Sequence, residues 1–212
     1  ASIAPRLVPQ AASLLTGLEL RGRTRVTWPL IQIREAVLTR GGDRFDGSVE
    51  FSVDARQPAF SATLHTATLD IVPILQPALS LLTANSRSWG ELNTLTSALQ
   101  PGRIDIRLSA DRLILGANTI EGAALSAQAG DRRFELMLNE GRLRSGSLKG
   151  RIAVTTQAQG DIDVKGHASL DRIEALTMLE PFSVTRFRGQ TTGTVTVGAA
   201  GSSFQQLMDS LE

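Results

Sequence analysis

Cysteine and tyrosine are absent from the 212 residues of this chain, and aromatic residues make up only 4% of it. Without cysteine the chain can form neither a disulfide bond nor a thiolate metal site, although this leaves the cellular compartment open. The scarcity of aromatic residues predicts a core of leucine, valine, isoleucine and alanine. No window of about 18 residues is apolar enough to span a bilayer, and the first residues lack the charged start and apolar centre of a signal peptide.

The chain also has no large excess of positive or negative charge. It contains 22 basic and 21 acidic residues, and its net charge is +1. The densest basic run, residues 142–151, is broken by glycine and serine and has no aromatic residues between its charges. Such a run is typical of a solvated strand face rather than of a nucleic-acid-binding patch. We therefore expect no nucleic-acid partner.

Alternation of apolar and polar residues predicts β-strands within 18–54, 60–68, 103–170 and 191–197. Short helices are expected in the remaining segments, at 69–83, 86–99, 171–179 and from Ser202 to the end, with Asp70 and Asp171 as N-caps of the first and third. The fold class is therefore mainly β with a few short helices.

The alternation changes phase in two places, which predicts β-bulges. In residues 104–116 the apolar positions pass from even to odd numbers near Asp111. In the hairpin 136–154, one extra residue within 139–141 sets Leu138 opposite Ile152 and Leu136 opposite Val154, around a turn at Ser145 and Gly146. Gly141 suits a left-handed bulge position. Repeated bulges favour a long, curved antiparallel sheet.

The chain also contains an internal repeat. Residues 46–55 resemble 145–154, and residues 68–75 resemble 169–176, with offsets of about 100 residues. The repeat predicts two units, one over 1–101 with an Asp-capped helix and a helical or loop connection, the other over 102–212. Because the second unit stops within a capped helix, we expect the chain to be a piece of a longer protein.

The residues carry no recognisable catalytic or metal-binding motif. His65 and His167 lie on predicted strands without the spacing of a metal site, and acids such as Asp105 and Asp163 alternate with isoleucine as a polar strand face does. No serine lies in a Gly-x-Ser-x-Gly elbow, and no glycine-rich loop enters a helix. We predict no enzyme activity, no metal and no cofactor.

One stretch resembles the C-terminal repeat of the AsmA family of Gram-negative envelope proteins. It is GRIDIRLSADRLILGANTIEGAALSAQAGDRRFELMLNEGRLRSGSLKGRIAV, residues 102–154. The positions that match the family pattern are Arg142, Leu143, Gly146, Leu148 and Gly150, while Ser145 replaces the first glycine of the family's usual pair. Residues 60–75 and 15–38 resemble the family segments that lie upstream, in the same order.

The resemblance implies a segment of a bridge-like lipid carrier built from repeated β-groove modules. Such proteins are anchored in the inner membrane by an N-terminal helix, extend into the periplasm and are associated with envelope lipid homeostasis and outer-membrane protein assembly. They are not enzymes. The anchor helix is not part of this sequence, so membrane contact and the periplasmic location are expectations from the family.

A sheet with one apolar face either folds on itself as a sandwich or leaves that face open as a groove. The residues alone favour the sandwich, whereas the family resemblance favours a groove for phospholipid acyl chains. The alternative function is a non-catalytic scaffold that binds envelope proteins through sheet edges or the polar face. The residues expected to line the groove are Val26, Trp28, Val49, Phe51, Val53, Ile104, Ile106, Leu108, Leu136, Leu138, Ile152 and Val154.

Overall fold

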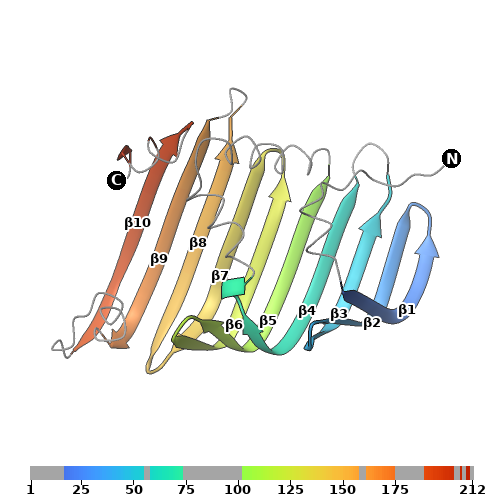
Figure 1. Ribbon diagram of the computed structural model, residues 1–212, viewed down its shortest axis with the longest axis horizontal. Helices are drawn as coiled ribbons and strands as arrows, with labels where there is room; N and C mark the ends of the chain where they lie inside the picture. Colours follow the sequence, from blue (N-terminus) through green and yellow to red (C-terminus); the bar gives the residue numbers. More distant parts are fainter. Residues whose placement is uncertain are drawn as a thin grey trace.

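Ten strands form one open sheet in the computed structural model (Figure 1). The structure describes residues 17–54, 58–73, 102–157, 161–174 and 189–202, together with Gln206, Asp209 and Ser210. The strands are β1 (Leu18–Thr27), β2 (Leu30–Arg40), β3 (Asp43–Ser52), β4 (Ala59–Asp70), β5 (Arg103–Leu115), β6 (Asn118–Gly130), β7 (Arg133–Leu143), β8 (Gly146–Thr156), β9 (Ile162–Glu174) and β10 (Gln190–Gly201).

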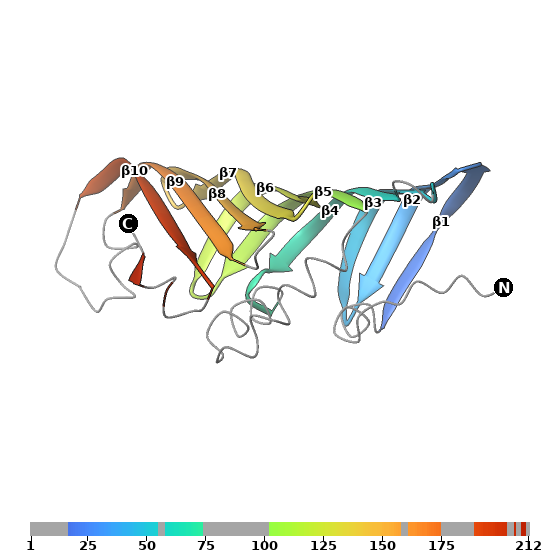
Figure 2. The same cartoon turned by 90° about the horizontal axis from the view of Figure 1, so that it is seen from above.

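The strands lie in the sheet in the order in which they occur in the sequence, from β1 at one edge to β10 at the other. Every neighbouring pair is antiparallel except β4 and β5, which are parallel. A parallel pair needs a connection of a dozen or more residues, and the chain between Asp70 and Arg103 is long enough. The strands at the two ends of the row are inclined in opposite directions, so the sheet is twisted (Figure 2).

The mainly β fold class and the long, largely antiparallel sheet are therefore confirmed. Strands from both predicted repeats join the same sheet, because β1 to β4 lie within 1–101 and β5 to β10 within 102–212. The division into two repeat units itself stays a prediction.

The predicted change of face near Asp111 is also confirmed. Ala110 and Leu113 are both buried in one cluster, although strict alternation would put them on opposite faces. Ala110, the residue just before the break, pairs with Thr66 on β4 and with Ala123 on β6. One residue on each of β4, β5 and β6 therefore stands outside the alternation at this level of the sheet.

The β7–β8 hairpin has the predicted bulge in a different register. Three residues of β7, 139–141, face two of β8, so one is extra. The turn is at Arg144 and Ser145, one residue earlier than expected, and Leu136 pairs with Ile152 rather than with Val154. The sequence misplaced the turn because Arg144, not a glycine, adopts the left-handed φ of 55°.

Gly141 does not adopt the left-handed conformation that was predicted for it. Its place in the bulge has a steric reason instead, because a Cβ atom there would lie 2.5 Å from Cγ2 of Ile120. The bulged strand thus passes close to a buried side chain of β6, and only glycine leaves room for that contact.

The predicted helix caps have different outcomes. The carboxylate of Asp70 accepts a hydrogen bond from the backbone N–H of Val72 at 3.0 Å, as a cap does, although the described part of this helix is only Val72 and Pro73. Asp171 is not a cap: it lies inside β9, whose residue Ile173 is fully buried. The prediction failed there because alternation shifted by a bulge imitates helical spacing.

The other predicted helical segments, 74–83, 86–99 and 175–179, lie outside the described residues. At the C-terminus, Gln206 and Asp209 are helical, and the hydroxyl of Ser202 lies 2.7 Å from Oε1 of Gln206. Among the described residues, no helix has the length and apolar character needed to cross a membrane.

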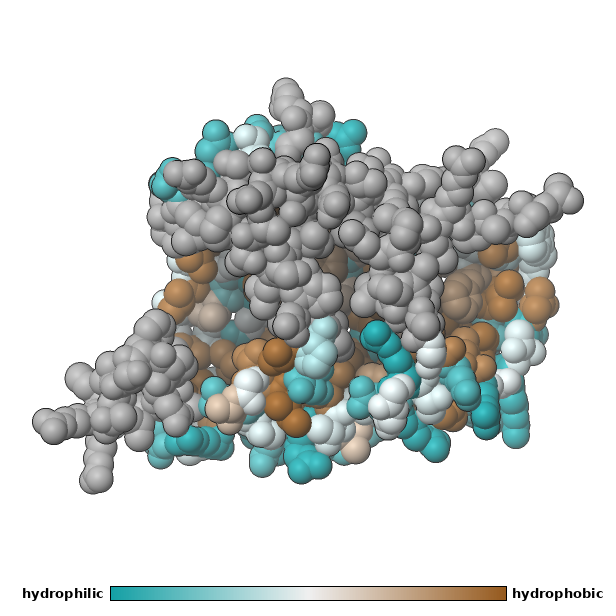
Figure 3. Space-filling view, viewed as in Figure 1, coloured by the Kyte–Doolittle hydropathy of each residue, from teal (hydrophilic) through white to brown (hydrophobic). Residues whose placement is uncertain are grey.

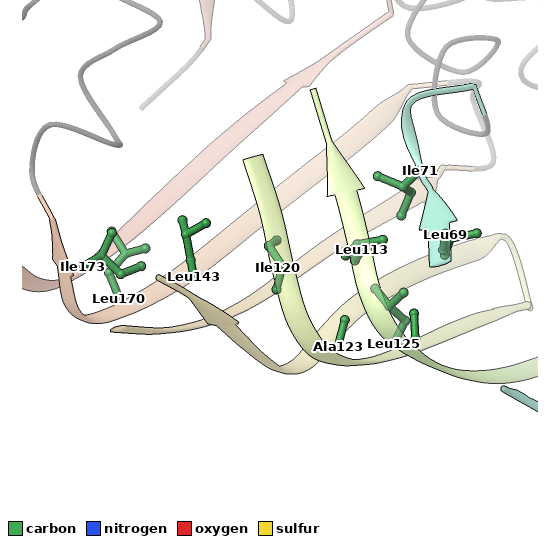
Figure 4. Close-up of a cluster of buried hydrophobic side chains, with 10 residues drawn as sticks. Leu69, Ile71, Leu113, Ile120, Ala123, Leu125, Leu143, Leu170 and Ile173 are labelled. Atoms are coloured by element: carbon green, nitrogen blue, oxygen red, sulfur yellow. The ribbon is translucent and has the colours of Figure 1, made fainter. Parts of the chain in front are cut away.

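The largest buried cluster lies at one end of the central strands (Figure 4). We call it the packed cluster, and it consists of Leu69, Ile71, Ala110, Leu113, Ile120, Ala123, Leu125, Leu143, Leu170 and Ile173. A smaller cluster near the β1 edge contains Ala36, Val49 and Ala62. The ribbons curve beside Ala123 and Leu125, next to the β6 break (Figure 4).

Candidate functional site

Three rows of cross-strand neighbours define the apolar face of the sheet. The first row crosses all ten strands and is apolar at every position: Val26, Ile31, Phe51, Phe60, Ile104, Ala129, Phe134, Val154, Val164 and Ala199. The second row is Thr24, Ile33, Val49, Ala62, Ile106, Ala127, Leu136, Ile152, Gly166 and Val197, and the third is Ala36, Gly47, Leu64, Leu108, Leu125, Leu138, Gly150, Ala168 and Val195.

Ten of the twelve predicted groove residues lie in these rows. Val26, Phe51, Ile104 and Val154 are in the first, Val49, Ile106, Leu136 and Ile152 in the second, and Leu108 and Leu138 in the third. The structure thus brings together residues up to 128 positions apart on one face. That they contact lipid stays a prediction.

The other two predicted residues lie beyond the ends of strands. Trp28 is in the two-residue turn between β1 and β2. Val53 follows β3, and its backbone N–H donates a hydrogen bond of 2.9 Å to the carbonyl oxygen of Pro29. Both therefore border the first row at the β1 end rather than lining the middle of the face.

Four side chains of the apolar face stay substantially in contact with water in the second half of the sheet. We call them the open strip: Phe134, Ile152, Val195 and Val197, with exposed fractions of 37%, 50%, 51% and 39%. Small residues lie between them, since Gly150, Gly166 and Ala168 occupy the intervening positions on β8 and β9. Below and beside the grey atoms in Figure 3, hydrophobic residues show in a band across the view, and hydrophilic residues are frequent along its lower margin.

Of the open strip, only Ile152 was predicted from the sequence. Phe134, Val195 and Val197 were missed because their exposure depends on their neighbours across the sheet. The signal was present for β10, whose TVTV alternation was recognised as a strand. Its partner residues on β9 are small, and only the register reveals this.

The opposite face of the sheet is polar and carries an ion-pair cluster. Glu135 on β7 is buried between Arg133 and Arg151. Its carboxylate accepts hydrogen bonds of 2.9 Å at Oε2 from Nη2 of Arg151 and from Nη2 of Arg133, and its Oε1 lies 2.7 Å from Nε of Arg151. These contacts, that with Arg151 foremost, hold the pKa of Glu135 below its ordinary value.

Shallow depressions also lie on the polar face. Polar-face side chains of β4 to β7, including Ser61, Asp105 and Gln128, line one of about 370 Å³. Another of about 510 Å³ lies between β7 and β10, with Asp163, Lys165 and His167 in its wall. Apolar residues also contribute to the walls, among them Ile104 and Ala129 in the first depression and Ala153 and Val197 in the second.

The structure brings a serine, a histidine and an aspartate together on the polar face, which sequence analysis did not anticipate. Nδ1 of His65 lies 3.2 Å from Oγ of Ser109, and its Nε2 lies 3.9 Å from Oδ2 of Asp111. The signal was hidden because the parallel pairing of β4 and β5 sets His65 opposite Ser109. His167 has an equivalent contact, with Nδ1 3.2 Å from Oγ1 of Thr196.

This group lacks the surroundings of a catalytic triad. All three side chains are exposed, and the His65–Asp111 distance exceeds that of a hydrogen bond. The backbone donors around Ser109 belong to the ladders of β5, so no pair of N–H groups is available to stabilise an oxyanion. The recurrence at His167 with threonine points to a cross-strand contact that stabilises the sheet.

Within the described ranges, histidine, aspartate and glutamate side chains do not gather in threes as a metal site requires. Comparison of the chain with protein-family models, curated proteins and solved structures finds no match in any of the three. The function is therefore argued from the geometry of the two faces and from the sequence resemblance described above.

Proposed function

We propose that the apolar face binds the acyl chains of phospholipids and shields them from water. The observation that carries this proposal is the first row, in which ten strands each contribute an apolar residue without interruption. A row of this kind follows the direction across the strands, at a spacing of about 4.8 Å per strand. It provides an elongated apolar path rather than a compact pocket.

The open strip supports the same proposal. Exposed apolar side chains that gather on one face of a folded domain normally mark a binding surface. Acyl chains match this surface because they gain from apolar contact and require no directional hydrogen bonds. The glycines and the alanine between Ile152 and Val195 have small side chains or none. They therefore leave space for an acyl chain to lie against the backbone of the sheet.

The resemblance to the AsmA family supports the biological setting of the proposal. In that setting the chain is a periplasmic segment of an inner-membrane-anchored protein, and it contributes to phospholipid transport and outer-membrane lipid homeostasis. Acyl-chain binding needs no catalytic group, so the proposed function is not enzymatic.

Native mass spectrometry of the purified chain tests the proposal, with two variants on β10 as a matched pair. Val195→Asp places a carboxylate in the open strip, and Thr194→Asp places one on the polar face of the same strand. We expect bound phospholipid in the original chain, a decrease of about tenfold or more in Val195→Asp, and no decrease in Thr194→Asp. Repeated purification without phospholipid, or equal lipid in both variants, contradicts the proposal.

A second candidate function is a scaffold for envelope proteins, and the β10 edge favours it. None of the twelve residues of β10 is charged, and within the described structure its only strand partner is β9. An uncharged edge of this length can accept an added strand from a partner. Crosslinking from β10 that captures an extended partner segment, in preparations free of phospholipid, favours the scaffold over lipid binding.

A further inference from the structure

The turn between β1 and β2 carries the most exposed large hydrophobic side chains in the described structure. Trp28 is 77% exposed and Val26 is 62% exposed. They lie two residues apart, in what we call the hairpin tip, residues 26–29. An indole ring that stays in water at the end of a hairpin is suited to the boundary between water and a membrane, where its apolar body and its N–H group both find partners.

Three arginines lie on the polar face of β1, just before the hairpin tip in the sequence. Arg21, Arg23 and Arg25 alternate with apolar or small residues, so all three point to the same face. The side chains of Arg21 and Arg23 are 81% and 82% exposed, although each contacts a glutamate at 3.1 Å. The row therefore presents its guanidinium groups to solvent.

The register adds a fourth arginine to this row, because Arg34 on β2 lies directly opposite Arg23. Like charges in opposite positions destabilise a sheet unless an anion lies near them. Glu35 provides part of that neutralisation through its contact with Arg23. A phosphate bound between the two arginines would complete it, since guanidinium groups bind phosphate oxygens in a bidentate manner.

The charge of the hairpin differs in sign from that of the rest of the chain. Residues 18–40 contain five arginines and two glutamates, which is a net +3. The whole chain carries +1, so the remaining residues together carry −2. Positive charge and exposed apolar side chains thus coincide at one end of the sheet, whereas the opposite edge strand, β10, has no charged residue.

We propose that the hairpin tip docks on the surface of a bilayer that contains anionic phospholipids. Trp28 and Val26 enter the interface between headgroups and acyl chains. Arg25, about 10 Å from Trp28 along the strand, then reaches the phosphate layer. Val26 is also the first member of the first row, whereas Trp28 and the arginines lie outside the three rows, so docking through them does not require acyl-chain binding.

Charge argues against a second copy of the chain at this edge. Two β1 strands paired antiparallel would set Arg21 of one copy near Arg25 of the other and the two Arg23 residues near one another. Such rows of like charge repel each other. An anionic bilayer attracts the same row, with each arginine near the surface strengthening binding about fivefold.

Tryptophan fluorescence with vesicles tests the docking. The chain has two tryptophans, so the Trp89→Phe variant leaves Trp28 as the only indole. We expect a blue shift of its emission with vesicles of phosphatidylcholine and phosphatidylglycerol, and quenching when the acyl chains carry bromine. Vesicles of phosphatidylcholine alone should give little change, and added salt should reverse the shift because the arginine contribution is screened.

Sedimentation with the same vesicles measures how strongly each variant binds to them. In the original background, Trp28→Ser and the triple change Arg21→Ser, Arg23→Ser and Arg25→Ser should each abolish most binding, whereas Thr194→Ser on the polar face of the other edge strand should not. The altered side chains are exposed, and circular dichroism checks that each variant folds. Unchanged Trp28 emission, equal binding to neutral and anionic vesicles, or full binding by Trp28→Ser overturns the proposal.

Failure of docking can be distinguished from failure of acyl-chain binding. We expect Trp28→Ser to keep co-purified phospholipid, and Val195→Asp to lose that phospholipid while keeping its binding to anionic vesicles. If Trp28→Ser loses the co-purified phospholipid as well, the hairpin tip belongs to the acyl-chain site and the separate docking surface is wrong.

Discussion

The packed cluster and the open strip lie on the same face of the same sheet and are built mainly from the same aliphatic residue types. Ile120 in the packed cluster is 2% exposed, whereas Ile152 in the open strip is 50% exposed. Both isoleucines occupy regular inward positions of their strands. Alternation of side chains therefore decides which face is apolar, and it does not decide how much of that face stays in water.

The difference in exposure implies that the packed cluster mainly stabilises the fold, whereas the open strip is available for binding. Apolar groups that are buried in the folded chain stabilise it by about 25 cal/mol per Å² removed from water. Apolar groups that remain exposed contribute little to folding but can still release water when a ligand covers them. The same substitution should consequently cost much more stability in the packed cluster than in the open strip.

The largest expected effect comes from Ile120→Ala, with Ile152→Ala as the matched control. We expect Ile120→Ala to lower the free energy of unfolding by about 2–5 kcal/mol, because it removes buried methyl groups and leaves a cavity. Ile152→Ala should cost about 1 kcal/mol or less, since half of that side chain is already exposed. Urea unfolding measures both, and similar losses would remove the distinction between the two regions.

The next largest effect concerns glycines of the two regions. In Gly141→Ala the new Cβ would lie 2.5 Å from Ile120, so we expect a loss of about 1–3 kcal/mol from overpacking. In Gly150→Ala the nearest atom lies 3.7 Å away, an ordinary contact, and stability should change by less than about 0.5 kcal/mol. Thermal unfolding of the two variants provides the measurement, and a tolerated Gly141→Ala would mean that β7 moves away from β6.

A smaller effect is expected on the polar face, at Glu135. Its pKa is lowered in the folded chain from the ordinary 4.5, so its contribution to stability is complete above about that pH and is lost as the pH falls through the lowered value. Glu135→Gln should cost about 1 kcal/mol at neutral pH and should weaken the dependence of stability on acid pH. Urea unfolding as a function of pH tests this, and an unchanged acid dependence would contradict it.

The smallest effect is expected at Ser109. Ser109→Ala removes an exposed hydroxyl that lies 3.2 Å from His65, and stability should change by less than about 0.5 kcal/mol. If the Ser109–His65–Asp111 group is only a cross-strand contact, background hydrolysis of p-nitrophenyl acetate should be the same in both proteins. Loss of a hydrolytic activity in Ser109→Ala would instead assign a catalytic role to this group.

Much of the fold follows from the sequence, because alternation and bulges are local properties. The change of face near Asp111 was predicted from the phase of alternation, and the extra residue in 139–141 from the matching of apolar residues across the expected hairpin. Turn chemistry was less reliable, since Arg144 takes a left-handed conformation that usually belongs to glycine. Asp171 was assigned to a helix because the buried residues Leu170 and Ile173, three positions apart, fit helical spacing as well as a bulged strand.

The candidate site could be predicted only in part. The inward direction of Phe51, Ile104 or Leu136 is a consequence of alternation, and the structure places them in common rows. The open strip depends on small residues of neighbouring strands, and the Ser109–His65 contact depends on a parallel pairing. Both are properties of long-range register, which a single strand does not encode.

The breaks on β4, β5 and β6 fall at one level of the sheet, around Ala67, Asp111 and Gly122. A strand that slid by two residues would keep its apolar side inward, so alternation alone cannot prevent such an error during folding. A slid strand would carry its extra residue away from the extra residues of its neighbours and would break the ladder twice. These aligned irregularities therefore disfavour a strand that is paired two residues out of place.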